Sequence, residues 1–288
     1  MSMNNQISTV AVCGAGTMGA GIAQVAAGKG FKTILYDLQD AVIEKAADKI
    51  RQQLQKLVDK GKISSDQQAQ TLSNLSFTTD ISSCKAEVII EAIVEKVAVK
   101  VELFSKLAAI NDPGTILCSN TSSLPIKEIA AGLPQPERVV GMHFFNPAPV
   151  MKLVEVVSAE QTATEVAEKI YGLAKQFGKT PVHVKDSPGF IVNRVARHYY
   201  LEAMQVAGQG VADIASIDRL MVSLGFKMGP FELMDLIGND VNLAVSQSLY
   251  DAFGKAERFK PGALQVEKVA AGELGRKTGK GFYDYQNR

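Results

Sequence analysis

Apolar positions in the first two-thirds of the chain follow two alternating patterns. Residues 9–13 and 32–36 are short apolar runs rich in β-branched residues, and the small-residue segment 19–28 between them is typical of a helix. From Asp40, which we expect to cap it, a longer segment repeats apolar residues at helical spacing up to Gly61. This alternation predicts a mostly parallel sheet with right-handed crossovers. We predict further strands at 77–79, 87–93, 115–119, 139–145, 153–157 and 181–185, and a helix at 97–110.

The pattern changes after Asp186. Ser187 followed by Pro188 is a typical helix start, because serine caps a helix and proline suits its first position. The rest of the chain has the pattern of helices, and no strand is expected before the last few residues. The sequence therefore predicts two domains, an α/β domain over residues 1–186 and an all-α domain over 187–288.

The first predicted strand runs into a glycine-rich segment that fits G-x-G-x-x-G: Gly14, Ala15, Gly16, Thr17, Met18 and Gly19. In that pattern the first glycine allows a tight turn, the second lets the backbone approach a pyrophosphate, and the third lets the helix pack on the strand. The helix N-terminus adds N–H groups and a positive dipole end for the phosphates. Asp37, after the next strand, can bind ribose hydroxyls and would repel a 2′-phosphate. The sequence therefore predicts a site for NAD rather than NADP.

The segment 139–157 carries one histidine and one glutamate. Two strand-like runs flank a turn that contains Pro147 and Pro149, so we expect them to return side by side and bring His143 next to Glu155. A carboxylate beside an imidazole fixes its tautomer and stabilises the imidazolium, as a general acid/base requires. A lone histidine among phenylalanines is more often a packed core residue, and the spacing alone leaves both interpretations open.

Composition excludes several classes of function. The 288 residues are 46% hydrophobic and 21% charged, which is typical of a soluble globular protein. The formal net charge of +1 disfavours nucleic acid and anionic membranes as partners, and no apolar run is long enough to span a bilayer. The N-terminus lacks the basic residues of a secretory signal, so we expect a cytoplasmic protein. Three cysteines and three scattered histidines indicate reduced thiols and no metal site.

Six short blocks occur in order over nearly the whole chain. They are residues 10–24, 119–124, 141–157, 186–194, 228–235 and 274–285. These blocks resemble the 3-hydroxyacyl-CoA dehydrogenase family, in particular its short bacterial members, the 3-hydroxybutyryl-CoA dehydrogenases. The resemblance implies a Rossmann-like N-terminal domain that binds NAD, and an all-α C-terminal domain that binds an acyl-CoA substrate and forms a homodimer.

The resemblance also implies a catalytic group, which matches Ser122, His143, Glu155 and Asn193. In the family pattern His143 exchanges the proton of the C3 hydroxyl, and Glu155 supports it. Ser122 and Asn193 then hydrogen-bond to the substrate oxygens. Without the resemblance, Ser122 could simply end a strand and Asn193 could be a surface amide.

Further matches are less specific. Ser122 also belongs to the positions near the cofactor, together with Glu95, Lys100, Asn146 and Lys277. Lys56 and Lys60 match positions that contact the phosphate-rich end of coenzyme A. Two lysines one helical turn apart are equally typical of a solvated helix face.

We therefore predict an NAD-dependent enzyme that interconverts (S)-3-hydroxybutyryl-CoA and acetoacetyl-CoA in fatty acid or butanoate metabolism. Two alternatives remain open. One is a relative that oxidises a small hydroxy acid or sugar acid with the same histidine and glutamate. The other is a catalytically silent NAD-binding sensor or structural protein.

Overall fold

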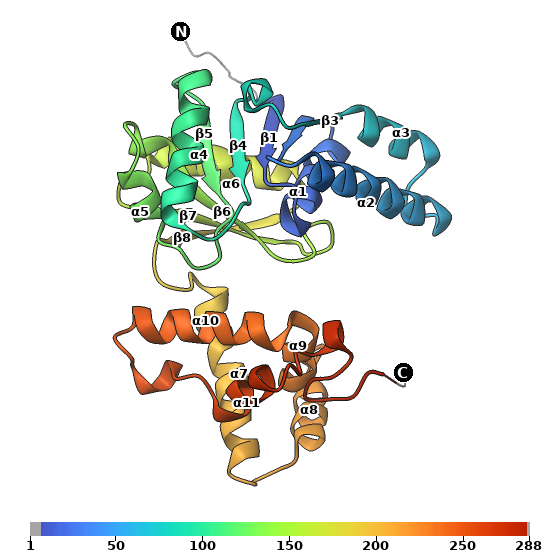
Figure 1. Cartoon of the computed structure of the whole chain (residues 1–288), viewed down its shortest axis with the longest axis vertical. Helices are drawn as coiled ribbons and strands as arrows, with labels where there is room; N and C mark the ends of the chain where they lie inside the picture. The colour runs from blue at the N-terminus through green and yellow to red at the C-terminus, as the bar shows by residue number, and fades with distance from the viewer. Residues whose placement is uncertain (1–6, 287–288) are drawn as a thin grey trace. The chain divides into compact units, whose positions relative to one another are not determined.

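The chain forms two compact units in the computed structural model, which describes residues 7–286, and the boundary lies between Ser187 and Pro188. The strands of the first unit are β1 (Thr9–Cys13), β2 (Lys32–Tyr36), β3 (Leu75–Thr78), β4 (Val88–Glu91), β5 (Ile116–Ser119), β6 (Val139–Phe144), β7 (Leu153–Ser158) and β8 (Thr180–Lys185). They form one sheet in the order β3-β2-β1-β4-β5-β6-β7-β8 (Figure 1). Every neighbouring pair is parallel except β6 and β7. The predicted α/β class is therefore confirmed.

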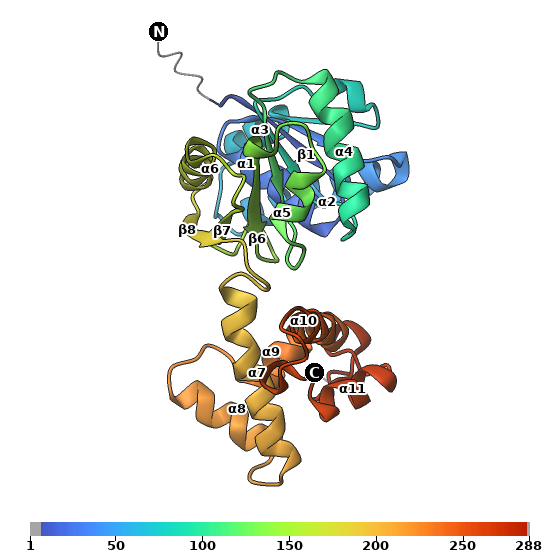
Figure 2. The same ribbon diagram turned by 90° about the vertical axis from the view of Figure 1, so that its left-hand side faces the viewer.

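Helices connect these strands and cover both faces of the sheet. They are α1 (Thr17–Gly28), α2 (Asp40–Asp59), α3 (Ser65–Ser73), α4 (Val97–Ile110), α5 (Ile126–Ala131) and α6 (Thr164–Gln176), with the 3-10 turns η1 (Ile81–Ser83) and η2 (Pro136–Arg138). Figure 2 shows α1 and α6 on one side of the sheet and α4 and α5 on the other. The strand order reverses between β1 and β4, and ligands of such sheets bind in the crevice at the carboxyl ends of these strands.

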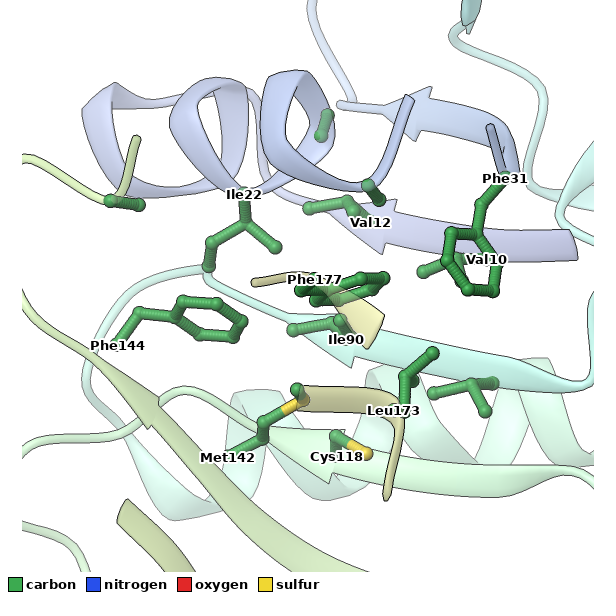
Figure 3. Packing of buried hydrophobic residues seen from close by; sticks show 14 of the residues in the cluster. Val10, Val12, Ile22, Phe31, Ile90, Cys118, Met142, Phe144, Leu173 and Phe177 are labelled. Carbon is green, nitrogen blue, oxygen red and sulfur yellow. The ribbon is translucent and has the colours of Figure 1, made fainter. Parts of the chain in front are cut away.

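The core on the α1 and α6 side of the sheet is apolar. Figure 3 shows Val12 and Ile90, which pair across β1 and β4, near Ile22 of α1 and Phe177. These side chains are at most 2% exposed and belong to one cluster that extends along the sheet. Because burying a large apolar side chain contributes about 1.5–3 kcal/mol, this cluster fixes the strands whose carboxyl ends carry the polar site.

The second unit is helical, as the sequence predicts. Its helices are α7 (Val192–Gly208), α8 (Ile214–Ser223), α9 (Pro230–Ile237), α10 (Asn239–Ala252) and α11 (Ala263–Ala270), with the 3-10 turns η3 (Glu257–Phe259) and η4 (Arg276–Thr278). The buried carboxylate of Asp218 accepts hydrogen bonds from the N–H groups of Phe231 (3.0 Å) and Glu232 (2.9 Å). These groups lie in the first turn of α9, where N–H groups lack partners within the helix, so Asp218 joins α8 to the start of α9.

Two helices start differently from the prediction. Helix α7 begins later than expected, at Val192, because Gly189 (φ 74°) and Phe190 (φ 51°) adopt left-handed backbone conformations that no α-helix contains. Asp40 is the first residue of α2 and not its cap. Gln39 occupies the capping position and makes no capping hydrogen bond through its side chain.

Within residues 7–286, no helix is long and apolar enough to cross a membrane. No group of three or more His, Cys, Asp or Glu residues in that range could hold a metal ion. Cys13, Cys84 and Cys118 are all buried, and none of them forms a disulfide.

Candidate active site

The glycine loop between β1 and α1 shows why Gly14 and Gly19 are needed and leaves space at Gly16. Gly14 has a φ of 100°, and an added Cβ would come within 2.6 Å of the carbonyl oxygen of Ala92. At Gly19 an added Cβ would lie 1.7 Å from the carbonyl oxygen of Gly14, so the helix could not approach the loop. At Gly16 an added Cβ would meet no atom within 4 Å. The loop therefore leaves open space beside the N-terminus of α1, as binding of the NAD pyrophosphate requires.

Asp37 lies at the carboxyl end of β2 and holds the glycine loop. Its Oδ2 accepts a hydrogen bond from the N–H of Ala15 at 2.8 Å, and its Oδ1 accepts one from the N–H of Gln39 at 3.3 Å. The sequence did not reveal this second role. A carboxylate offers about four acceptor positions, so Asp37 can still accept hydrogen bonds from ribose hydroxyls.

His143 and Glu155 form a buried pair between two antiparallel strands. They are directly opposite each other in the β6–β7 register, and His143 Nδ1 lies 2.8 Å from Glu155 Oε2. The imidazole is 5% exposed and the carboxylate is fully buried. The ring of Phe145 packs on the imidazole with its centroid at 4.5 Å. The turn between the strands thus brings together the two side chains that the sequence singled out, and their surroundings allow little movement.

A buried ion-pair network lies at the carboxyl end of β4. Lys100 is 1% exposed, and its Nζ lies 2.5 Å from Glu91 Oε1 and 3.0 Å from Glu95 Oε2. Glu91 also accepts hydrogen bonds from Ser119 Oγ (2.7 Å) and from the N–H of Ile93 (2.8 Å). Burial raises the pKa of Glu91, although Lys100 opposes this shift. Lys100, which was expected near the cofactor, places its ammonium between these two carboxylates.

Glu95 holds the loop that carries Ser122. Its Oε1 accepts hydrogen bonds from Thr121 Oγ1 (2.5 Å) and from the N–H of Ser122 (2.9 Å). Burial opposes ionisation of Glu95, but Lys100 and these hydrogen bonds outweigh it and lower the pKa. The N–H of Phe144, next to His143, donates to the side chain of Asn120 at 2.9 Å in the same loop. The ends of β4, β5 and β6 are thereby linked through polar side chains.

The remaining predicted site residues belong to other elements of the two units. Asn193 and Lys277 lie in the second unit, in α7 and η4, and Lys277 pairs with Asp240 at 2.5 Å. In the first unit, Asn146 is exposed after β6, and Lys56 and Lys60 are exposed at the end of α2.

Sequence reasoning missed Glu91, Asn120 and Ser119. The position of Glu91 could have indicated a buried carboxylate, because it directly follows the apolar residues 88–90 of a buried strand. A buried carboxylate needs a cation or several hydrogen bonds, so a polar network was to be expected there.

A glycine loop suited to a nucleotide, a carboxylate placed for a ribose and a buried imidazole–carboxylate pair occur in one mostly parallel sheet. This combination defines the class of dinucleotide-dependent oxidoreductases. Residues 9–187 match the family model described as "3-hydroxyacyl-CoA dehydrogenase, NAD binding domain", and residues 189–285 match "3-hydroxyacyl-CoA dehydrogenase, C-terminal domain". The chain therefore belongs to the 3-hydroxyacyl-CoA dehydrogenase family, and its cofactor is NAD.

Individual relatives agree with this family. The chain is 49% identical over 282 residues to "3-hydroxyadipyl-CoA dehydrogenase" of Escherichia coli, which covers 97% of the chain but 59% of that relative. It is 42% identical to "Probable 3-hydroxybutyryl-CoA dehydrogenase" of Bacillus subtilis, with 98% and 99% covered. The crystal structure of (S)-3-hydroxybutyryl-CoA dehydrogenase from Ralstonia eutropha superposes with a TM-score of 0.93 at 40% identity, and the match covers 98% of this chain and 100% of that one. The predicted family resemblance, fold class and cofactor are confirmed.

Proposed function

We propose that the protein interconverts (S)-3-hydroxybutyryl-CoA and acetoacetyl-CoA with NAD as the hydride carrier. The observation that carries this proposal is the contact of 2.8 Å between His143 and Glu155 in the unit that contains the glycine loop. Relatives from Bacillus subtilis and Ralstonia eutropha, similar over nearly their whole length, are named for this reaction, which supports the same choice of substrate.

The roles of the residues follow from their contacts. NAD, when bound, accepts the hydride from C3 of the substrate. Because Nδ1 of His143 faces Glu155, Nε2 is the atom that exchanges a proton with the C3 oxygen. Glu155 stabilises the imidazolium formed in oxidation, and the same proton returns in reduction. Ser122 and Asn193 donate hydrogen bonds to substrate oxygens where charge develops.

The glycine loop and Asp37 hold the adenosine end of NAD in this proposal. Glu95 and Asn146, both exposed, bind nearer the nicotinamide, with Lys277 from the second unit. Lys56 and Lys60 meet the phosphates of coenzyme A. Their exposure allows this role but also fits a solvated helix face.

The test is a comparison of two histidine variants in NADH oxidation with acetoacetyl-CoA. His143→Gln should lower kcat by about 10²–10⁴ and leave the affinity for NADH nearly unchanged, because the imidazole acts on the substrate. His183→Gln is the matched control, since His183 is an exposed histidine that stacks on Tyr171 in the same unit. Retention of more than half of the wild-type turnover by His143→Gln would refute the assignment. Wild-type activity with free acetoacetate equal to that with acetoacetyl-CoA would favour a hydroxy-acid relative instead.

A second candidate substrate is 3-hydroxyadipyl-CoA, for which the Escherichia coli relative at 49% identity is named. An adipyl chain ends in a carboxylate, whereas a butyryl chain ends in a methyl group. The two candidates therefore differ in whether the protein offers a cation to the end of the acyl chain.

We also propose that the second unit mediates a homodimer of a cytoplasmic enzyme. Phe231 and Met234 are buried in the core of the second unit and cannot contribute to this contact. Large apolar side chains that are exposed at α8, α9 and the segment between them are Leu220, Leu224, Phe226, Leu236 and Ile237. Light scattering coupled to size exclusion should give a mass near twice 30.9 kDa.

A further inference from the structure

Arg197 in α7 is a buried cation without a carboxylate partner. It is 2% exposed, and within residues 7–286 no aspartate or glutamate forms an ion pair with it. Its Nη1 donates to the carbonyl oxygen (2.8 Å) and Oδ1 (3.0 Å) of Asn242 and to Ser246 Oγ (3.0 Å). The guanidinium lies 5.0 Å from the ring centroid of Tyr200. Burial lowers the pKa of Arg197 to about 10, so the group is still charged at neutral pH.

One edge of this guanidinium has no hydrogen-bond partner in the described protein. The hydrogen bonds that Arg197 makes within residues 7–286 all use Nη1, and Nε is buried without an acceptor. Nη2 donates no hydrogen bond to another group within residues 7–286. Asn242 Nδ2, a second buried donor, also has no partner. A buried donor without an acceptor costs about 1–3 kcal/mol.

The unpaired N–H groups of Arg197 and its uncompensated positive charge indicate which kind of ligand would bind here. An ionised carboxylate only accepts hydrogen bonds, and it pairs side by side with two N–H groups of an arginine. It would neutralise Arg197 and satisfy Nε and Nη2 together. A neutral acyl end could do neither.

Arg197 lies close in α7 to Asn193, the residue that we assign to a substrate oxygen. Arg197 follows Asn193 by four residues in α7, so the two side chains lie on one face about one helical turn apart, or about 5.4 Å. In an acyl chain of six carbons, C6 lies three bonds beyond C3. Three extended single bonds span about 3.8 Å, as between consecutive Cα atoms, so C6 and its carboxylate can reach the next helical turn when the C3 oxygen is bound to Asn193.

We propose that Arg197, assisted by Asn242, binds a carboxylate at the far end of the acyl chain, so that the preferred substrates are 3-hydroxyacyl-CoA thioesters that carry this second acid group. This inference rests on the proposed dehydrogenase function and on the assignment of Asn193 to the substrate. In this role Arg197 determines substrate specificity and takes no part in hydride transfer.

The test uses two thioesters that differ only at the chain end. 3-Hydroxyadipyl-CoA and (S)-3-hydroxyhexanoyl-CoA have the same carbon count, with a carboxylate and a methyl group at C6. Since a hydrogen-bonded charge contributes about 1.5–3 kcal/mol, the wild-type enzyme should prefer the adipyl thioester about 10- to 150-fold in kcat/KM. Arg197→Gln should reduce this ratio to about one, and Arg197→Lys should retain part of it. The ratio does not depend on the fraction of active enzyme, so a modest folding defect cannot imitate the effect.

Arg219→Gln, which changes an exposed arginine in α8, is the matched control and should keep the wild-type ratio. A wild-type ratio of one or less overturns the proposal even if no variant folds. An unchanged ratio in Arg197→Gln overturns the assignment of Arg197. Failure of the proposed function would appear differently, as an absence of turnover with both thioesters and with acetoacetyl-CoA.

Discussion

Replacement of Lys100 by methionine tests the buried network behind the Ser122 loop. Methionine keeps most of the side-chain volume but removes the charge that lies 2.5 Å from Glu91 and 3.0 Å from Glu95. Glu91 is fully buried and would keep only its two hydrogen bonds from Ser119 and Ile93. Breaking a buried pair by removing one partner costs about 3–5 kcal/mol, because the other charge is left uncompensated.

We expect a loss in the free energy of unfolding of about 3–5 kcal/mol at pH 8. The contribution from Glu95 is small, since its side chain is 37% exposed and water screens it. Burial already raises the pKa of Glu91 in the folded protein, and loss of Lys100 raises it further. A folded-state pKa above the unfolded value means that folding binds a proton as the pH falls. The loss should therefore be smaller at pH 5.5 than at pH 8.

Urea unfolding followed by circular dichroism measures this loss, and two variants provide the controls. Lys106→Met, on the same helix, breaks an exposed pair with Glu102 and should change the free energy by less than about 1 kcal/mol. The double variant Glu91→Gln/Lys100→Met removes both charges and should recover much of the stability. A loss below 1 kcal/mol for Lys100→Met at pH 8, or an equal loss at both pH values, would show that the network is not the buried ion pair described above.

Three further changes test the remaining assignments. Glu155→Gln should lower kcat because the imidazolium loses its counter-charge, and an unchanged kcat would restrict this residue to packing. Asp37→Ser with Leu38→Arg should shift kcat/KM from NADH toward NADPH, since a 2′-phosphate then meets a cation; an unchanged ratio would mean that the ribose is bound elsewhere. Lys56→Ala with Lys60→Ala should raise KM for acetoacetyl-CoA at low salt but not for a truncated thioester without the nucleotide. Equal KM values would indicate a solvated helix face.

Much of the first unit was predictable because its signals are local. The glycine loop needs only a strand, three glycines and a helix in succession, and Asp37 follows the next strand. The pairing of His143 with Glu155 could also be inferred, since an antiparallel return fixes which residues lie opposite each other. In both cases the residues that determine the geometry lie within a short stretch of sequence.

The network around Lys100 was not predictable in the same way. Glu91, Lys100 and Ser119 belong to β4, α4 and β5, and their contacts depend on the strand order of the whole sheet. A charged residue early in a helix is usually exposed, so nothing in the sequence pattern indicated that Lys100 is buried. The late start of α7 was also not predictable, but its cause is local. Ser187 and Pro188 carry the usual start signal, but the left-handed residues that follow delay the helix.

The role inferred for Arg197 depends on its burial, which the sequence does not show. In the sequence it follows Asn193 by four positions in a segment with helical pattern, where an arginine is ordinarily solvated. The structure encloses it among amide, hydroxyl and aromatic groups that supply no negative charge. A protein that needed only packing at this position could use an apolar side chain at lower cost, since a buried charge destabilises unless it is paired. Retention of a charged side chain there is explained if its partner arrives with the substrate.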